Sequence, residues 1–162
     1  MTENVFKMSR MDKAEYDRLV HDHCVCRIAF KGDDHPHVAP FIYVFDGQFL
    51  YFLSTRYGKK VQYFRDNPSV TVEIDEYSAD LSLFRFVALP GKLVEVKDAA
   101  ECRAVRERFV DLVHGLSPNV LSALGHSPDQ PVEILREADN NTVWKLVGVD
   151  VAKILGLKSH TR

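Results

Sequence analysis

Residues 54–60 bring together the groups that suit a phosphate. The hydroxyls of Ser54 and Thr55 end an apolar run, and after a short turn Lys59 and Lys60 stand where a helix is expected to begin. Backbone N–H groups and the dipole at a helix N-terminus attract anions, and lysines neutralise them. This segment therefore predicts a site for a terminal phosphate.

The plain alternative is that these lysines are solvated side chains at the start of a helix. Lysines are disfavoured there, however, because the N-terminal end of the helix dipole is positive. No Asp or Glu lies between Asp46 and Asp66 to compensate them, so we expect an anion to do so. The segment lacks the spacing Gly-x-x-x-x-Gly-Lys-Ser/Thr, which excludes a Walker nucleotide loop.

A second group of chemically capable side chains, His21, His23, Cys24 and Cys26, offers soft metal ligands at short spacing. We expect no metal, because the group crosses from a helix end into a strand and no second ligand cluster has tetrahedral-site spacing. The cysteines are expected to be buried as small apolar residues. No catalytic acid, base or nucleophile is identifiable by spacing, which is typical of a protein whose chemistry belongs to a cofactor.

The bulk properties bound the class of protein. The 162 residues are 46% hydrophobic and 27% charged, as in an ordinary globular protein, and we expect one domain over residues 1–162. A net charge of −2 argues against a nucleic-acid binder. No apolar run reaches the roughly 20 residues that span a bilayer. Without a signal-peptide pattern, and with three cysteines, the expected location is the reduced cytoplasm.

The hydrophobic periodicity predicts the elements that must position these groups. Residues 1–10 are expected to be a loose lead-in. Strands are expected at 24–30, 37–45, 48–53, 70–74, 83–96 and 142–155. Helices are expected at 12–23, 57–67 and 99–116, and residues 99–131 together form a helical region whose loop, 117–131, could act as a lid.

Three local signals refine this pattern. Asp46-Gly47 predicts a tight hairpin turn. Pro40 inside a strand pattern predicts an edge, a bulge or a ligand, because it removes a ladder donor. Pro90-Gly91 predicts a bulge. Six antiparallel strands with two or three helices indicate a mainly β fold, a six-stranded antiparallel barrel with α additions.

The order of these features resembles the FMN-binding split-barrel proteins related to pyridoxamine 5′-phosphate oxidase, over about residues 11–96. Residues 53–60 are similar to the motif Y-T-N-x-x-S-R-K of that oxidase, and residues 85–92 to its strand R-Q-V-x-x-x-G-K. In the first motif Ser54 takes the place of the threonine, Gly58 of the serine, Lys59 of the arginine and Lys60 of the lysine.

The resemblance implies a split barrel that binds FMN and works as a homodimer, with the site at the interface. It places the phosphate on the turn after residue 53 and the isoalloxazine ring beside the strand at 38–42. The implied cofactor-binding residues are Val38, Ala39, Pro40, Ile42, Ser54, Thr55, Gly58, Lys59 and Lys60.

Two departures select a branch of the family. Phe86 replaces a flavin-contacting glutamine, and the C-terminal motif R-L-x-P…W is missing after Trp144. The chain therefore resembles the branch of nitroimidazole-resistance reductases more than the true oxidase. The expected activity is NAD(P)H-dependent reduction of a small organic acceptor. Two alternatives stay open: a non-enzymatic flavin carrier or sensor, and a haem-binding or haem-degrading protein that uses a histidine. The candidate haem ligands are His35, His37 and His126.

Overall fold

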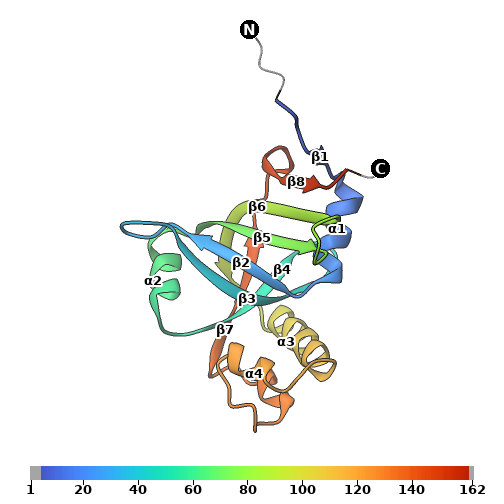
Figure 1. Cartoon of the computed structure of the whole chain (residues 1–162). Helices are drawn as coiled ribbons and strands as arrows, with labels where there is room; N and C mark the ends of the chain where they lie inside the picture. The colour runs from blue at the N-terminus through green and yellow to red at the C-terminus, as the bar shows by residue number, and fades with distance from the viewer. Residues whose placement is uncertain (1–4, 161–162) are drawn as a thin grey trace.

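The structure, a computed structural model, describes residues 5–160. Its strands form one antiparallel sheet in the order β1-β8-β6-β5-β2-β3-β4-β7, and β7 also pairs with β6 (Figure 1). This second pairing closes β6, β5, β2, β3, β4 and β7 into a barrel, so the predicted six-stranded antiparallel barrel is confirmed. The strands are β1 Ser9–Arg10, β2 Val25–Phe30, β3 His37–Phe45, β4 Leu50–Thr55, β5 Ser69–Tyr77, β6 Phe84–Glu95, β7 Asn141–Val147 and β8 Leu155–Lys158.

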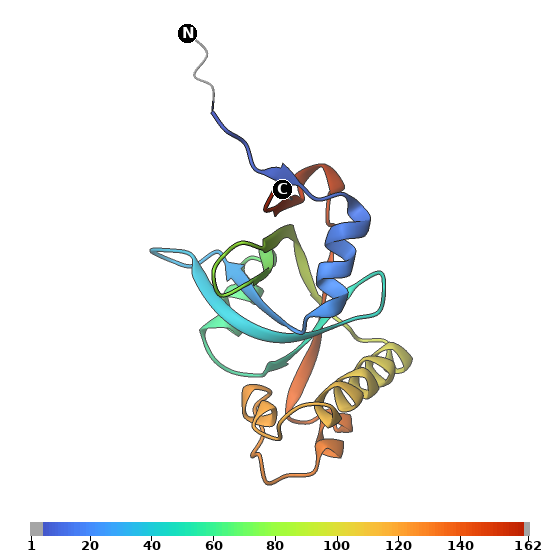
Figure 2. The same cartoon turned by 45° about the vertical axis from the view of Figure 1, so that its right-hand side comes forward.

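Between residues 5 and 160, four α-helices and two short 3₁₀ helices surround this barrel. They are α1 Lys13–Asp22, α2 Lys59–Asp66, α3 Ala99–His114, α4 Val120–Ala123, η1 Val132–Arg136 and η2 Val151–Lys153. Helix α1 begins in a capping box, since Asp12 and Glu15 each accept a hydrogen bond from the other's backbone N–H. Helices α3 and α4 lie at the end of the molecule opposite β1 and β8 (Figures 1 and 2). No helix between residues 5 and 160 is both long and apolar enough to cross a membrane.

The core has two parts because alternate strand residues face opposite sides of the barrel wall. Residues such as Phe30, Phe52 and Trp144 fill the barrel. Tyr51 and Leu53, which alternate with Phe52 on β4, instead pack outward against α3, α4 and η1. The helical region is therefore seated on the outer face of β3, β4 and β7.

Both chain ends differ from the sequence prediction. The predicted strand at 142–155 is interrupted: β7 ends at Val147, Gly148 follows with φ +65°, and η2 precedes the separate strand β8. The predicted loose lead-in contains β1, which pairs with β8. A two-residue strand carries no periodicity, so hydrophobic pattern alone could not reveal it.

The predicted bulge at Pro90-Gly91 is wrong, because the register between β5 and β6 is continuous through both residues. The N–H of Leu93 bonds to Pro68 O, so alternation turns the nitrogen of Pro90 away from β5. On that side β6 pairs with β8 over 85–88 and with β7 over 92–95, which leaves Pro90 between them. Gly91 is needed for close packing, since an added Cβ would lie 2.8 Å from Val147 O.

The predicted hairpin turn at Asp46-Gly47 is present, although β4 begins two residues later than predicted. Strand β3 ends at Phe45 and β4 begins at Leu50 rather than at residue 48. The Asp46 carboxylate accepts hydrogen bonds from the backbone N–H groups of Gln48 (2.9 Å) and Phe49 (2.7 Å). The Asp46 N–H in turn donates to Phe49 O at 3.2 Å, which continues the register of β3 and β4 and leaves Gly47 and Gln48 as a tight hairpin turn.

Candidate functional site

The barrel opens where β3 and β4 diverge. These strands pair only through residues 43–45 and 50–52. Before residue 43, β3 pairs with β2 alone, and beyond residue 52, β4 continues beside β7 as far as Thr55. The wall of the barrel therefore has an open edge along residues 38–42, as the proline in this strand predicted.

The backbone direction of β3 shows what this edge presents. The N–H of Tyr43 bonds to Cys24 O at 2.8 Å, so the polar backbone groups of residues 38 and 40 point away from β2. Val38 is 57% exposed, and Pro40 has no N–H at the position where no ladder partner exists. The edge therefore offers apolar side chains together with the N–H of Val38 and the carbonyls of both residues.

The four predicted residues of this edge do not all face the same way. Val38, Pro40 and Ile42 lie on the outer face, whereas the side chain of Ala39 packs against the barrel core. A ligand along the outside could meet Ala39 only through its backbone.

Residues 54–60, below called the basic turn, run from the end of β4 to the start of α2. Two hydroxyl groups within this segment stabilise its shape. Ser54 is 0% exposed and its Oγ donates to Thr55 O at 2.9 Å, while Thr55 Oγ1 donates to Tyr57 O at 3.1 Å. Both hydroxyl hydrogens are engaged in shaping the turn, a role that the sequence pattern did not indicate. An anion would compete with these carbonyls for the same donors.

Helix α2 begins at Lys59, two residues later than predicted, and none of the described side chains caps the backbone N–H groups of its first turn. Gly58 occupies the N-cap position with φ +102°, and within residues 5–160 no side chain caps the helix and no acid stands in its first turn. The first N–H groups to bond back are those of Val61 and Gln62, both to Gly58 O. The preceding backbone donors are therefore available to a ligand or to water.

Lys60 is the lysine that the fold brings inward. Its Nζ lies 5.2 Å from the centre of the Phe41 ring, and burial lowers the pKa of its ammonium group. In the described part of the chain, neither Lys59 nor Lys60 forms an ion pair. A partly buried cation without a counter-charge is stabilised when an anion binds beside it.

The conformation of Gly58 leads to a stability prediction. At φ +102° and ψ 171° an added Cβ meets no neighbour within 4 Å, so Gly58→Ala introduces backbone strain alone. We expect it to lower the free energy of unfolding by about 1–3 kcal/mol. Gly115→Ala is the matched control, because Gly115 has an ordinary φ of −86°. Equal losses for the two variants in urea denaturation would show that the turn is not strained.

The comparisons with known proteins decide the family. The family model described as pyridoxamine 5′-phosphate oxidase matches residues 12–136. The chain belongs to this oxidase family. The curated protein RA0666 of Rhizobium meliloti (strain 1021), itself uncharacterized, is 28% identical over 96 residues, which are 59% of this chain. The match spans 62% of that relative's length.

Solved structures of low sequence identity share the fold. A FAD-binding protein from Mesorhizobium loti aligns with a TM-score of 0.70 at 19% identity, covering 96% of this chain and all of that one. A candidate 5-nitroimidazole antibiotic resistance protein from Bacteroides thetaiotaomicron gives 0.61 at 18%, covering 99% and 98%. A heme binding protein from Mycobacterium smegmatis gives 0.61 at 17%, covering 85% of this chain and 52% of that one. The family predicted from sequence is confirmed by the family model, and the solved structures share its split-barrel fold.

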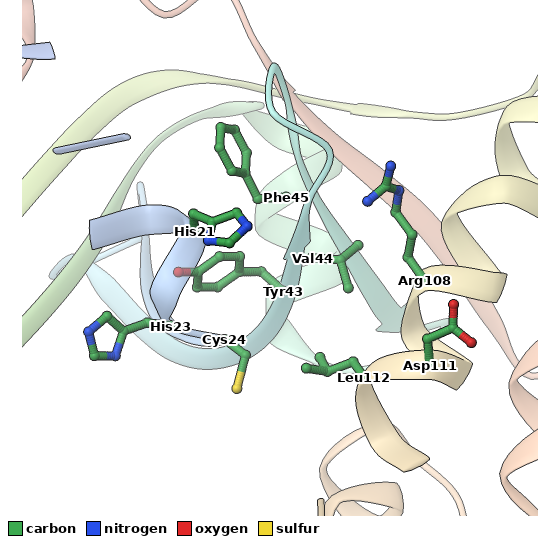
Figure 3. A pocket seen from close by; sticks show the side chains of 9 residues that line it. All are labelled: His21, His23, Cys24, Tyr43, Val44, Phe45, Arg108, Asp111 and Leu112. Atoms are coloured by element: carbon green, nitrogen blue, oxygen red, sulfur yellow. The ribbon is translucent and has the colours of Figure 1, made fainter. Parts of the chain in front are cut away.

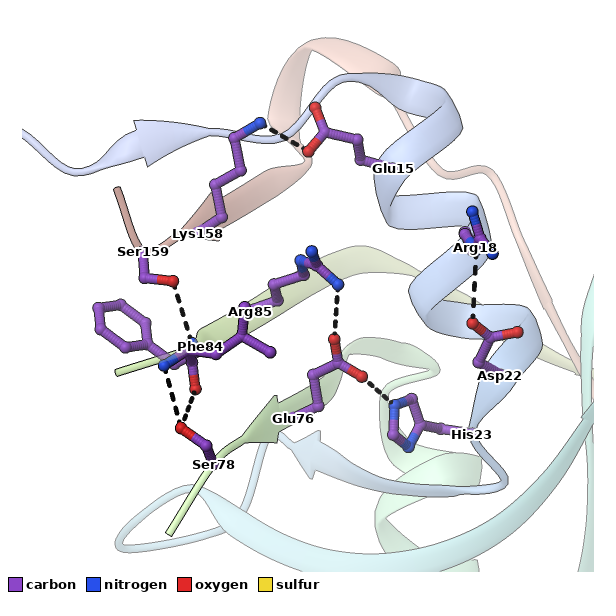
Figure 4. Close-up of polar contacts among 11 residues, drawn as sticks. Glu15, Arg18, Asp22, His23, Glu76, Ser78, Phe84, Arg85, Lys158 and Ser159 are labelled. Carbon is purple, nitrogen blue, oxygen red and sulfur yellow. Dashed lines mark hydrogen bonds and ion pairs between the residues drawn. The ribbon is translucent and has the colours of Figure 1, made fainter. Parts of the chain in front are cut away.

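Arg85, the first residue of the second motif that resembles the oxidase family, makes a structural contact at a corner away from the basic turn. Arg85 Nη1 donates to Glu76 Oε1 at 2.9 Å, and His23 Nε2 lies 2.7 Å from Glu76 Oε2 (Figure 4). These contacts join β6, β5 and the end of α1. The hydrogen bond from His23, followed by that from Arg85, lowers the pKa of the Glu76 carboxyl.

This corner should weaken in acid. A carboxyl whose pKa is lowered by folding contributes stability above its ordinary pKa, and the contribution is lost as the pH falls through the folded value. We therefore expect Glu76→Gln to flatten the decline in unfolding free energy between about pH 6 and pH 3. The exposed Glu95→Gln is the control. Parallel pH profiles for wild type and Glu76→Gln would contradict the assignment.

The histidine and cysteine group at 21–26 is divided by the barrel wall. His21, His23 and Cys24 line a cavity of about 240 Å³ between α1, β3 and α3 (Figure 3), whereas Cys26 faces the barrel core. Cys26 is fully buried, as expected of a small apolar residue, and burial raises the pKa of its thiol. The same expectation is wrong for Cys24, which is only half-buried. Across residues 5–160, no three His, Cys, Asp or Glu side chains are grouped as metal ligands.

Sequence reasoning missed a polar cluster behind the basic turn, formed by Arg106, His126 and Asn141, all buried. One signal was available. Arg106 follows Cys102 by four residues and precedes Phe109 by three, so it stands on the apolar stripe of the predicted helix at 99–116. An arginine on a buried stripe predicts a buried hydrogen-bonding role.

Proposed function

We propose that this protein binds FMN, with its phosphate on the basic turn and its ring along the open edge of β3, and that it reduces a small organic acceptor with NAD(P)H. The observation that carries the proposal is the partly buried, unpaired Lys60 beside the uncapped start of α2. A phosphate there would satisfy the backbone donors and offset the cost of burying the ammonium group. A bound flavin would supply the hydride and electron transfer.

The geometry of the basic turn and of the open edge supports a set of proposed cofactor contacts. Lys59, Lys60 and the N–H groups at the start of α2 hold the phosphate, and Ser54, Thr55 and Gly58 shape the turn. Val38, Pro40 and Ile42 give the ring an apolar surface, while Ala39 contributes backbone. A single short cradle suits one terminal phosphate, which favours FMN over a dinucleotide.

We also propose that the active form is a homodimer. Val25 and Val38 are both exposed on the outer face of neighbouring strands, beside the open edge. A second copy placed there would cover these side chains and enclose the ring. We further propose that the loop 117–131 closes over the basic turn, because it already lies beside this turn. A Cβ added at Gly125 would be 3.0 Å from the methyl group of Thr55.

The absorption spectrum of the purified protein tests the cofactor. Flavin bands, FMN as the species released on denaturation, and a dimeric mass by light scattering are the expected results. FAD as the released species would overturn the choice of FMN, and a haem Soret band would favour the haem alternative. Oxidation of NADH or NADPH only when an acceptor such as a nitroimidazole is present would support a reductase. A flavin-loaded protein that oxidises neither would instead be a carrier or sensor.

A further inference from the structure

The buried arginine behind the basic turn holds several segments together at once. Arg106, 5% exposed on α3, donates from Nη1 to Leu135 O (3.1 Å), Glu137 O (3.0 Å) and Asn141 Oδ1 (2.7 Å), and from Nη2 to Asn141 O (3.0 Å). Each of these acceptors is a carbonyl or amide oxygen. Within residues 5–160 no carboxylate pairs with this guanidinium, so its charge depends on these dipoles.

This cluster is connected to the basic turn through β7. Asn141 is the first residue of β7 and pairs with Thr55, the last residue of β4. Arg56 Nη2 donates to Ala138 O at 2.8 Å, and Gly125 lies against the Thr55 methyl group. Thr55 and Arg56 of the basic turn are thus contacted by Gly125, Ala138 and Asn141.

His126 completes the cluster and must be neutral to do so. Arg106 donates to Asn141 Oδ1, so Asn141 Nδ2 is the donor that lies 3.4 Å from His126 Nε2, and Nε2 must accept. The imidazole therefore carries its proton on Nδ1. His126 is 7% exposed.

Protonation of His126 would break this arrangement. Nε2–H would face the donor Nδ2, and a second positive charge would lie near Arg106. Among the described residues, two charged groups lie near the ring. Arg106 on α3 disfavours the protonated imidazole, and Glu137 after η1 favours it. Burial, followed by the positive charge of Arg56 in the basic turn, lowers the pKa of Arg106. Burial, followed by the charge of Arg106, lowers the pKa of His126.

A histidine whose pKa is lowered by folding contributes stability that is complete above its ordinary pKa and is lost as the pH falls through the folded value. Neutral pH therefore keeps the cluster intact, and acid opens it.

We propose that Arg106, Asn141 and His126 form a pH-sensitive hydrogen-bonded cluster, below called the pin, that positions the basic turn. Protonation of His126 then releases the turn and weakens phosphate binding. The binding part of this inference rests on the proposed function. The release of the turn does not, because it concerns contacts within the chain. Arg106 and His126 are positioning residues that act through Asn141 and Thr55.

Hydrogen exchange of the full chain without added ligand tests the pin itself. After correction for the intrinsic pH dependence, we expect the hydrogen-bonded amides of residues 53–55 in the β4–β7 pairing and of residues 121–126 to exchange about tenfold faster at pH 5.5 than at pH 7.5. His126→Gln keeps an acceptor but cannot titrate, so its corrected exchange should be the same at both pH values. The exposed His35→Gln should behave as wild type. Equal pH dependence in wild type and His126→Gln would overturn the proposal.

FMN titration by fluorescence quenching tests the consequence for binding. The FMN phosphate has its own second pKa of about 6, so its protonation weakens binding in every variant. We therefore expect the wild-type Kd to rise from pH 7.5 to pH 5.5 by about tenfold more than the Kd of His126→Gln. Arg106→Lys keeps the charge without the forked donors, so it should show the fast exchange already at pH 7.5, and slow wild-type-like exchange would count against the pin. A protein that binds no FMN at any pH refutes the proposed function, while the exchange data still decide the pin.

Discussion

Lys60→Glu is expected to abolish flavin retention while leaving the fold intact. The substitution replaces the inward ammonium group of the basic turn by a carboxylate facing the same phosphate. Two unit charges about 4 Å apart near a protein surface interact by about 4 kcal/mol, so turning attraction into repulsion weakens binding by far more than a thousandfold. An acid in the first turn of α2 also suits the helix dipole, so stability should not fall.

The measurement is the ratio of flavin to protein after purification, with circular dichroism as the check on folding. Lys60→Gln, which removes the charge without reversing it, should retain an intermediate amount. Lys97→Glu makes the same charge change at an exposed position before α3 and should stay yellow. A folded Lys60→Glu protein that remains fully yellow would move the phosphate elsewhere.

The largest stability effect is expected at Trp144. This side chain is 1% exposed, and its ring lies 4.6 Å from that of Phe64 on α2, 5.9 Å from Phe41 and 6.3 Å from Phe30. Trp144→Ala removes this packing and should lower the free energy of unfolding by about 3–5 kcal/mol. Because Phe64 belongs to the helix that begins at the basic turn, the variant should also bind the proposed phosphate less well.

Urea denaturation measures the loss. Trp144→Phe keeps an aromatic ring in the same cluster and should lose less than Trp144→Ala. Tyr77→Ala removes an exposed aromatic side chain from β5 and should change stability by less than about 0.5 kcal/mol. A Trp144→Ala loss no larger than that of Tyr77→Ala would mean that the ring does not support the barrel.

The barrel could be predicted because its strands and helices carry signals in their local sequence. Strand β2 alternates with period two, Asp12 and Asp98 cap α1 and α3, and Asn67-Pro68 ends α2. The sequence prediction failed where the result depended on which neighbouring strand a backbone nitrogen faces. Pro90 carries no sign of which side its nitrogen faces, and only the neighbouring strands decide whether a missing donor needs a bulge.

The candidate site also has a part that local sequence reveals and a part that it does not. The basic turn is local, so seven consecutive residues reveal its charge and its helix start. The cluster around Arg106 is not local, since its acceptors are spread between residues 135 and 141 and most of them are backbone carbonyls. A carbonyl has no sequence signature, so only the unusual place of Arg106 on an apolar stripe pointed to it.

The proline at the open edge of β3 also bears on how the protein avoids self-association into fibrils. A strand edge without a partner is a template on which another polypeptide can add a strand. Pro40 interrupts the row of outward N–H donors at its centre, so an incoming strand would find no continuous ladder. A small molecule needs only one or two of these groups. The edge can therefore stay accessible to a ligand and still be a poor seed for aggregation.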